Sequence, residues 1–567
     1  DEDWYRAIAG FLAVRFVADP GPYLERPVDP WPDPPVRLDA VPVAGPVGIR
    51  WMLAPEPAWL PRLAAFVCLR PDLARHVAVT TPAALASVFP HRVDLVRPGR
   101  LAPLHLIAPE MVAERPVTLA QAAAIAATGI TLGGLAAALP AIAHISAVTA
   151  LNGALLGHAA TRLVAARHGQ PRPRGLALPR NRDLPVYSVL VPLHREAAVV
   201  PQLVRALAEL DYPRDRLDIQ FLVEEHDRDT IEALAARSGE LGGAATVTIV
   251  PDGRPRTKPR ALNVGLRRAR GALVTIFDAE DRPEPDQLLK AAAVFAAAPP
   301  QVACLQAHLV VDHAGDGWIT RMFAIEYAAL FDGILPMLSD HGWFFLLGGT
   351  SNHFRRDALL AVGGWDPWNV TEDADLAVRL ARNGYALRQL PSATYEEAPL
   401  TVRAWLAQRT RWFKGWIQTF LVHNRNPLRL VREMGLRDAL IFHVLVLGGF
   451  VSTLAHPFFC ALLVLYAAGA VPLVPAPTAA GIAISALSAA VFVVGYGATF
   501  WLAALGMRRR GMRAPPTTLL TFPLYWLLMS VALALAIWDL IVRPHYWAKT
   551  RHGLARRPSM ASLRRRA

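Results

Sequence analysis

Long apolar stretches alternate with segments of mixed polarity along this chain and divide it into parts. Residues 116–161 contain no Asp, Glu, Lys or Arg. At about 20 residues per crossing, this stretch is long enough for two membrane helices, with Pro140 at the turn between them. Arginines are frequent in residues 162–174, which predicts a cytoplasmic position for that end. We therefore predict two transmembrane helices in residues 116–166, preceded by a cytoplasmic module, residues 1–115.

Residues 180–400 have a different pattern, in which short apolar, β-branched runs alternate with helical segments. The runs are YSVLVPLH, DIQFLVE, ATVTIV and ALVTIFDAED, and amphipathic stretches such as PQLVRALAEL lie between them. This alternation predicts an α/β domain with a mostly parallel sheet. Ligands of such sheets bind at the carboxyl ends of the strands. These ends carry His194, Glu196, Glu224, Glu225, Asp278, Glu280 and Asp281.

Apolar segments return after residue 430. The candidate membrane segments are 438–455, 456–474, 481–505 and 516–541. We predict about four crossings in residues 436–542, after interfacial helices in 401–435 and before a basic cytoplasmic tail, 543–567. Four crossings place the basic run MRRRGMR outside, against the positive-inside rule. Two crossings would avoid this conflict if the first and last of these segments lay along the membrane interface.

The module of residues 1–115 mixes polar and apolar positions and is rich in proline. PVGIRWML and HVAV predict short strands, and TTPAALASVF predicts a helix with Thr81 as its cap and Pro82 in its first turn. We expect a small α/β or α+β fold with a docking or regulatory role. The acidic start, DEDWYRAIAG, is not typical of a signal peptide.

Composition supports a membrane protein. The chain has 567 residues, of which 53% are hydrophobic and 19% are charged. Its net charge of +13 suits positive-inside loops, anionic lipid or a nucleotide diphosphate. The arginines are dispersed without a nucleic-acid-binding motif, so no nucleic-acid partner is expected. The isolated cysteines, Cys68, Cys304 and Cys460, predict neither a disulfide framework nor a zinc site.

Three polar motifs carry candidate chemistry. In FDAED, Asp278 and Glu280 lie two positions apart at a strand end, where two carboxylates suit Mg²⁺ or Mn²⁺, although a solvated acidic turn is the alternative. In TEDAD, Asp373 is a candidate general base, although acids after the capping residue Thr371 also suit a helix start. In TKPRALN, Lys258 predicts a phosphate contact, or else a solvated basic loop.

The stretch AWLAQRTRWFKGWIQ interleaves tryptophans with basic residues just before an apolar region. Trp and Arg at such a position are typical of a membrane-interface belt. An indole also offers a platform for a sugar ring, and a guanidinium matches a diphosphate. We interpret Trp405, Lys414 and Trp416 as belt residues.

The order of these motifs between residues 184 and 430 resembles the processive family 2 glycosyltransferases, such as the cellulose, chitin and hyaluronan synthases. The resemblance implies a cytoplasmic GT-A domain joined to a membrane channel. It implies nucleoside contacts by His194, Glu196 and Glu225, with Glu225 at the uracil, and a donor contact by Lys258. It implies a metal site of Asp278 and Glu280, with Asp281 as the alternative second ligand, and a catalytic base, Asp373. Gln408 and Arg411 would face the diphosphate, and Trp412 would stack under the acceptor sugar. Residues 36–92 resemble, more faintly, the N-terminal domain of type II secretion ATPases.

The tail sequence WAKTRHG resembles the gating loop of cellulose synthases in its spacing of aromatic, Thr, basic residue and Gly. We expect Trp547, Thr550 and His552 to lie above the bound donor, and an ordinary basic tail beside the membrane is the alternative. Two departures from the family pattern are Glu280 in place of Asp, and EEH, which includes Glu225, in place of DDG. The second leaves the base specificity open.

Taken together, the motifs and the resemblance predict an inverting glycosyltransferase of the inner membrane. It would use Mg²⁺ or Mn²⁺ and transfer sugar from a UDP-sugar to the non-reducing end of a polysaccharide, which would be translocated as it grows. Accessory export subunits are possible partners. The alternatives are a lipid-linked sugar transferase that adds one residue, and a catalytically silent membrane scaffold or transporter.

Overall fold

The computed structural model describes residues 2–25, 41–44, 48–55, 60–69, 71–88, 104–169, 183–470, 478–513, 516–546, 553, 555 and 557. The chain forms two compact units, Asp1–Pro109 and Glu110–Ala567, and each is described by itself.

The first unit is a small α/β module. Its five-stranded sheet has the order β1-β5-β4-β3-β2, with strands at Arg15–Phe16, Val77–Val79, Trp51–Leu53, Val41–Ala44 and Leu24–Glu25. Helix α1 (Glu2–Phe11) packs Tyr5 and Ile8 against the sheet, together with Leu63 of α2 (Leu60–Leu69). The predicted helix after Thr81 is α4 (Pro82–Val88), and the Thr81 hydroxyl accepts the Ala84 N–H at 3.1 Å. The expected α/β fold is confirmed.

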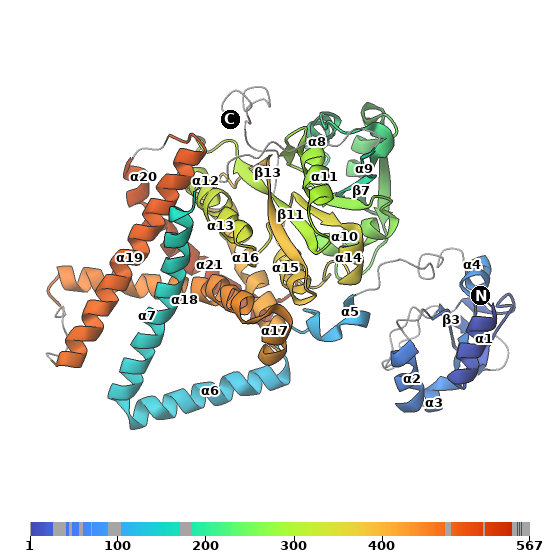
Figure 1. Ribbon diagram of the computed structural model, residues 1–567, viewed down its shortest axis with the longest axis horizontal. Helices are drawn as coiled ribbons and strands as arrows, with labels where there is room; N and C mark the ends of the chain where they lie inside the picture. The colour runs from blue at the N-terminus through green and yellow to red at the C-terminus, as the bar shows by residue number, and fades with distance from the viewer. Residues whose placement is uncertain are drawn as a thin grey trace. The chain divides into compact units, whose positions relative to one another are not determined.

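The second unit contains the predicted α/β domain, built on an eight-stranded mixed sheet of order β10-β13-β11-β12-β9-β6-β7-β8 (Figure 1). The parallel half consists of β9 (Leu273–Ile276), β6 (Tyr187–Leu193), β7 (Leu217–Glu224) and β8 (Ala245–Val250). The mixed half consists of β10 (Arg282–Pro283), β13 (Ala386–Glu396), β11 (Val302–Val311) and β12 (Asn352–Arg355).

Every residue of β7 is buried, because helices cover both faces of this half of the sheet. Burial on both faces explains why apolar side chains occupy successive positions of β7, such as Phe221, Leu222 and Val223. Helices α8 (Val200–Ala208) and α11 (Gln287–Ala297) bury Leu203, Leu207 and Leu288 in the same core as Val189 and Phe221. The expected GT-A-like fold, an α/β domain joined to long apolar helices, is confirmed.

Six helices are long and apolar enough to cross a membrane among the described residues, which indicates a membrane protein. They are α6 (Leu119–Ala138), α7 (Pro140–Arg167), Trp318–Asp340, α18 (Leu436–Ala467), α19 (Ala479–Arg509, with its candidate span from Gly481) and α21 (Phe522–Val542). The segment Trp318–Asp340, which contains α12 (Trp318–Ala329), differs from the other five because 67% of its most apolar window is buried in protein.

The predicted break between residues 455 and 456 is wrong, because α18 is one continuous helix through Pro457. The described part of residues 436–542 therefore contains three long apolar helices where the sequence pattern predicted four, with the short α20 (Pro516–Leu520) before the third. A proline within a long apolar helix removes one hydrogen bond without ending it, because neighbouring turns and packed helices hold the backbone.

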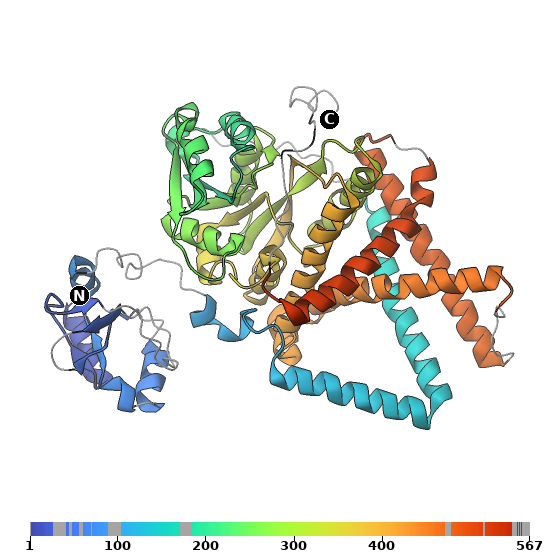
Figure 2. The ribbon, with the colours of Figure 1, turned by 180° about the vertical axis from the view of Figure 1, so that it is seen from behind.

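Contacts at their ends join the apolar helices to the α/β domain. Asp332 pairs with Arg510, just after α19 ends, and the Arg510 guanidinium also donates to the Leu309 carbonyl at 2.9 Å. Gly506 of α19 lies so close to the backbone of Ala328 in α12 that any side chain would collide with it. Helix α21 packs along α16 (Val402–His423), as Figure 2 shows.

This packing corrects the belt interpretation of two residues. Trp405 is fully buried and donates its indole N–H to the Tyr525 hydroxyl at 3.1 Å. Lys414 is also buried, and its ammonium donates to the Tyr546 carbonyl at 2.6 Å. Helix α21 covers this face of α16, so neither side chain is available to a lipid interface.

Candidate active site

The turn after β9 places two acids differently. The carboxylate of Asp281 accepts the Asp278 N–H at 2.7 Å and the Thr350 hydroxyl, so Asp281 is buried and stabilises the turn. Asp278 and Glu280 line a cavity instead. The geometry therefore favours Glu280 over Asp281 as the second acid that faces a ligand.

The side chain of Lys258 lies close to these acids. Lys258 begins α10 (Lys258–Arg268), and its ammonium lies 2.5 Å from Asp278 Oδ1 and 3.6 Å from Glu372 Oε1. It also donates to the Gly349 carbonyl at 2.7 Å. Although burial opposes its charge, the carboxylates of Asp278 and Glu372 raise the pKa of Lys258 above its ordinary value. Lys258 is therefore positively charged at any physiological pH.

Asp373 lies in the first turn of α15 (Glu372–Arg382), close to where α16 crosses. Thr371 was expected to cap α15, but its side chain makes no capping hydrogen bond. Thr371 instead packs against Gly415 of α16, where a β-carbon would collide with it. A glycine at this position lets α16 approach α15 closely enough for both helices to contribute to one site.

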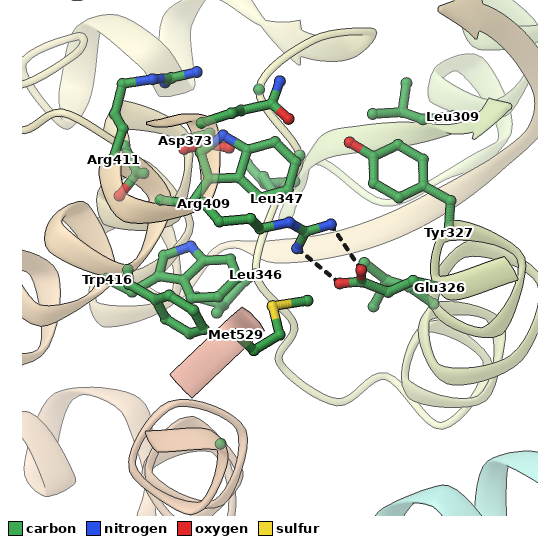
Figure 3. Close-up of a pocket in the computed structure, with 18 of the residues that line it drawn as sticks. Leu309, Glu326, Tyr327, Leu346, Leu347, Asp373, Arg409, Arg411, Trp416 and Met529 are labelled. Carbon is green, nitrogen blue, oxygen red and sulfur yellow. Dashed lines mark hydrogen bonds and ion pairs between the residues drawn. The ribbon is translucent and has the colours of Figure 1, made fainter. Parts of the chain in front are cut away.

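A continuous cavity of about 780 Å³ collects most of the predicted site residues. Nine of them line it: His194, Glu196, Lys258, Asp278, Glu280, Asp373, Gln408, Arg411 and Trp412. Figure 3 shows Asp373 and Arg411 at one side of the cavity and Glu326 with Tyr327 at the other. Residues from five separate segments of the chain thus share one space.

The structure does not bring Glu225 into this cavity, contrary to the prediction. Its backbone N–H donates a hydrogen bond to the Val250 carbonyl of β8, and its side chain is exposed. Glu224, the last residue of β7, lines the cavity in its place. Glu224 is the last residue of β7 and Glu225 lies beyond it, so the point at which the strand ends decides which of the two acids faces the cavity.

The expected gating residues Trp547, Thr550 and His552 lie outside the described residues. Nearby described residues contact the wall of the site: Glu397, which lines the cavity, accepts the backbone N–H groups of Gly553 at 2.8 Å and Ala555 at 2.9 Å. Arg557 forms an ion pair with Asp312 at 2.8 Å and donates to the Glu280 carbonyl. Sequence reasoning missed these contacts, which join positions about 150 or more residues apart.

Crowded carboxylates give the site unusual electrostatics. Burial, followed by repulsion from Glu372, raises the pKa of Asp373 from 3.8 to about 7. Burial and then Asp278 raise the pKa of Glu280 well above its ordinary value, and burial with Asp281 raises that of Glu396 to about 8. A raised pKa of this kind suits a carboxylate that must take up a proton during a reaction near neutral pH.

The donor set fits a divalent cation that shares its ligands with a substrate. Asp278 and Glu280 line the same cavity, and a cation between them would relieve the repulsion that burial imposes on Glu280. Among the described residues no group of three His, Cys, Asp or Glu side chains could hold a metal ion by itself. Phosphate oxygens and water would therefore complete the shell, which is how Mg²⁺ and Mn²⁺ are commonly bound.

A buried network holds α15 and α16 in register. The Asp375 carboxylate accepts from Arg379 Nε at 2.7 Å and from His423 Nε2 at 3.0 Å. His423 Nδ1 accepts from the Arg382 guanidinium at 3.0 Å, so the ring must be neutral. Burial accordingly lowers the pKa of His423. The network fixes the position of Asp373 relative to Arg411, because the two residues lie on the two helices that it joins.

Replacing Asp375 by asparagine is expected to destabilise the protein by about 3 kcal/mol, since it leaves the buried charge of Arg379 without its carboxylate. Thermal unfolding of the purified protein in detergent checks this. Glu240→Gln is the control, because Glu240 pairs with Arg237 at the surface, where the two side chains are 41% and 39% exposed, so its loss should cost less than about 1 kcal/mol. Equal melting temperatures for the two variants would contradict a structural role for the network.

Comparison with known proteins agrees with this architecture. Residues 273–541 match the family described as Glycosyl transferase family group 2. The chain is 29% identical over 244 residues to the probable glycosyltransferase YdaM of Bacillus subtilis, covering 41% of this chain and 56% of that protein. It is 28% identical over 270 residues to the beta-monoglucosyldiacylglycerol synthase of Synechocystis, covering 46% and 55%.

A plant relative and a solved structure are also similar. Glucomannan 4-beta-mannosyltransferase 2 of Arabidopsis thaliana is 29% identical over 262 residues, covering 45% of this chain and 48% of that protein. A mannosyltransferase from Pyrobaculum calidifontis, solved with GDP-Man and Mn²⁺, aligns with a TM-score of 0.43 at 19% identity, over 70% of this chain and 98% of that one. The chain spans about half the length of the curated relatives it matches. Residues 273–541 are thus similar to the family group 2 glycosyltransferases, and they belong to a chain in which a GT-A-like α/β domain is joined to long apolar helices.

Proposed function

We propose that this protein transfers a sugar from a UDP-sugar to the non-reducing end of a growing polysaccharide and moves the product into the membrane as it grows. One observation carries the proposal: the carboxylate of Asp373 shares a cavity with the Lys258–Asp278 pair on one side and with Arg411 and Trp412 on the other. Such a site offers a base for the acceptor, cations for a diphosphate and a platform for a sugar ring.

In the proposed reaction, Asp373 accepts the proton of the acceptor hydroxyl as that oxygen attacks the anomeric carbon of the donor. The bond to the diphosphate breaks as the new glycosidic bond forms, which inverts the configuration at that carbon. Lys258 and Arg411 stabilise the charge that develops on the leaving diphosphate. Asp278 and Glu280 would hold a divalent cation, which when bound supplies further neutralisation of this charge.

The acceptor would approach from the membrane side, because the cavity continues from Trp412 between the apolar helices. Its walls there include Phe450 of α18, Phe492 and Tyr496 of α19, and Trp526 of α21. A pyranose ring stacks on such aromatic faces. A lipid acceptor is the second candidate, since the same walls suit acyl chains and one relative is named a glucosyldiacylglycerol synthase.

The contacts of the apolar helices suggest a simple topology. The start of α18 (Asp438), the end of α19 (Arg510) and the segment after α21 (Arg543) all bond to residues of the catalytic domain or of α16. We infer that α18 and α19 form a hairpin that crosses and returns, and that α21 lies along the interface. The basic run 507–513 then stays on the catalytic side, which we propose is cytoplasmic, in agreement with the positive-inside rule.

Purified protein in detergent, supplied with Mn²⁺ and with radiolabelled UDP- and GDP-sugars in turn, tests the proposal. We expect turnover of a UDP-sugar, loss of turnover on chelation, and a product that linkage-specific hydrolases degrade. A product extracted with lipid would favour the second candidate. No release of nucleoside diphosphate from any donor would overturn both.

A further inference from the structure

Three charged side chains face the membrane-side part of the cavity, where most of the other walls are apolar. They are Arg162 of α7, Glu326 of α12 and Arg409 of α16, and we call them the charged girdle. Apolar residues such as Ile325, Phe413, Phe450 and Met529 surround them. Charged groups in such surroundings are costly, so each requires a partner or a function.

Glu326 is held rigidly by groups behind it. The Arg409 guanidinium donates to both of its carboxylate oxygens at 2.7 Å, and the Tyr525 hydroxyl donates to Oε2 at 2.6 Å. Figure 3 shows Arg409 extending across the site to Glu326. The side chain of Arg409 is only 3% exposed, whereas that of Glu326 is 32% exposed. Three bonds leave a carboxylate with acceptor capacity, so Glu326 can still accept from a group in the cavity.

Arg409 also connects the girdle to the proposed sugar platform. Its guanidinium lies over the Trp412 ring, 4.5 Å from the ring centroid, and over Phe323 at 4.8 Å. The guanidinium thereby covers part of the indole and restricts where a ligand can stack on it. The ion pair with Glu326 therefore fixes both the indole and the carboxylate in one assembly.

Arg162 completes the girdle from α7. Within the part of the chain that the structure describes, its side chain has no hydrogen-bond or ion-pair partner, and Glu326 is close enough to stabilise its charge electrostatically. The neighbouring His158, one helical turn away, also lines the cavity, and its Nδ1 has no hydrogen-bond partner among the described residues. The guanidinium of Arg162 is therefore left for a ligand that the cavity receives.

We propose that the charged girdle is an acceptor subsite beside Trp412 that binds the hydroxyl groups of a sugar residue. Sugar hydroxyls both donate and accept, which matches a carboxylate with spare acceptor capacity and a guanidinium with free donors. An acyl chain would leave these groups unsatisfied, and an anionic headgroup would meet the carboxylate of Glu326. The inference rests on the proposed function, since it describes the acceptor of that reaction.

The test measures acceptor use and donor use separately in the full-length protein. Arg162→Gln removes a charge that has no hydrogen-bond or ion-pair partner among the described residues, so this variant should fold. Glu326→Gln keeps the shape of the side chain but leaves the buried guanidinium of Arg409 without its carboxylate, so its melting temperature is measured alongside its kinetics. Arg167→Gln is the control, because Arg167 is exposed on the same helix and does not line the cavity. Cellotetraose, mannotetraose and dioctanoylglycerol serve as probe acceptors. Hydrolysis of the UDP-sugar, in which water replaces the acceptor, reports donor use by itself.

We expect the two girdle variants to raise the apparent KM for a tetraose about 10-fold, as loss of a hydrogen bond to a charged group does. Donor KM and donor hydrolysis should stay at wild-type values, and Arg167→Gln should change neither. An unchanged KM for the tetraoses, an effect on dioctanoylglycerol alone, or a wild-type protein that hydrolyses the donor but uses neither tetraose would overturn the subsite. A wild-type protein with no donor turnover at all would instead overturn the proposed function.

Discussion

Asp373→Asn is expected to reduce sugar transfer by roughly 1000-fold, within the range that a general base contributes. The amide keeps the size of the side chain but cannot accept the proton of the acceptor hydroxyl. Turnover of a radiolabelled UDP-sugar measures the loss. Asp357→Asn is the matched control, because Asp357 also lies in the first turn of a helix (α14, Arg356–Ala361) but is exposed and outside the cavity. A variant at Asp373 that retained a tenth of the activity would exclude this residue as the base.

The role of Asp373 as the base also predicts in which direction the rate of sugar transfer changes with pH. Because the pKa of Asp373 is about 7, its carboxylate is protonated below that pH and cannot act as a base. The rate should therefore fall about tenfold for each pH unit below 7 and level off above it. A rate that stays constant between pH 5 and 8 would contradict this assignment.

The stability of the folded protein should fall with rising pH over the range in which the rate of sugar transfer rises. The pKa of Asp373 rises from 3.8 in the unfolded chain to about 7 in the folded one, so the folded state binds more protons between these values. Stability then falls as pH rises through this window, and the full penalty is present above pH 7. Asn carries no such penalty. We expect Asp373→Asn to melt at a higher temperature than wild type at pH 8, with the difference shrinking towards pH 4.

Asp278→Asn is expected to reduce turnover by several hundredfold and to weaken Mn²⁺-dependent binding of UDP. The amide removes one of the two carboxylates proposed to hold the cation, and it also removes the partner of Lys258. Isothermal titration with UDP, in the presence and absence of Mn²⁺, measures binding independently of turnover. If Mn²⁺ strengthens UDP binding equally in wild type and variant, Asp278 is not a ligand.

Substitutions of the neighbouring acids Glu280 and Asp281 distinguish metal binding from stability of the turn. Glu280→Gln should lose Mn²⁺-dependent UDP binding without a loss of stability, because Glu280 faces the cavity. Asp281→Asn should mainly lower the melting temperature, because Asp281 holds the Asp278 turn through the N–H of Asp278 and the Thr350 hydroxyl. The reverse pattern would assign the second ligand to Asp281.

Local patterns in the sequence were sufficient for the α/β domain, the long apolar helices and most of the site. The spacing of apolar residues in a strand or helix reflects whether one face or both are buried, and this spacing can be read from neighbouring residues. Asp278, Asp373 and Trp412 each lie in a short motif, so the candidate residues next to them in the chain could be identified with them. The order of those motifs also predicted a family 2 glycosyltransferase, which the comparison supports, and the processive type, which stays a prediction.

Contacts between distant segments were decided by the tertiary structure alone. Whether Glu224 or Glu225 faces the cavity depends on how β7 ends against β8, and the burial of Trp405 and Lys414 depends on where α21 packs. The pairing of Arg409 with Glu326 joins residues 83 positions apart, and no local pattern marks it. Hydrophobic periodicity specifies which face of an element is buried, because that depends on neighbouring residues, but not which distant side chain meets it, because that depends on the packing of the whole fold.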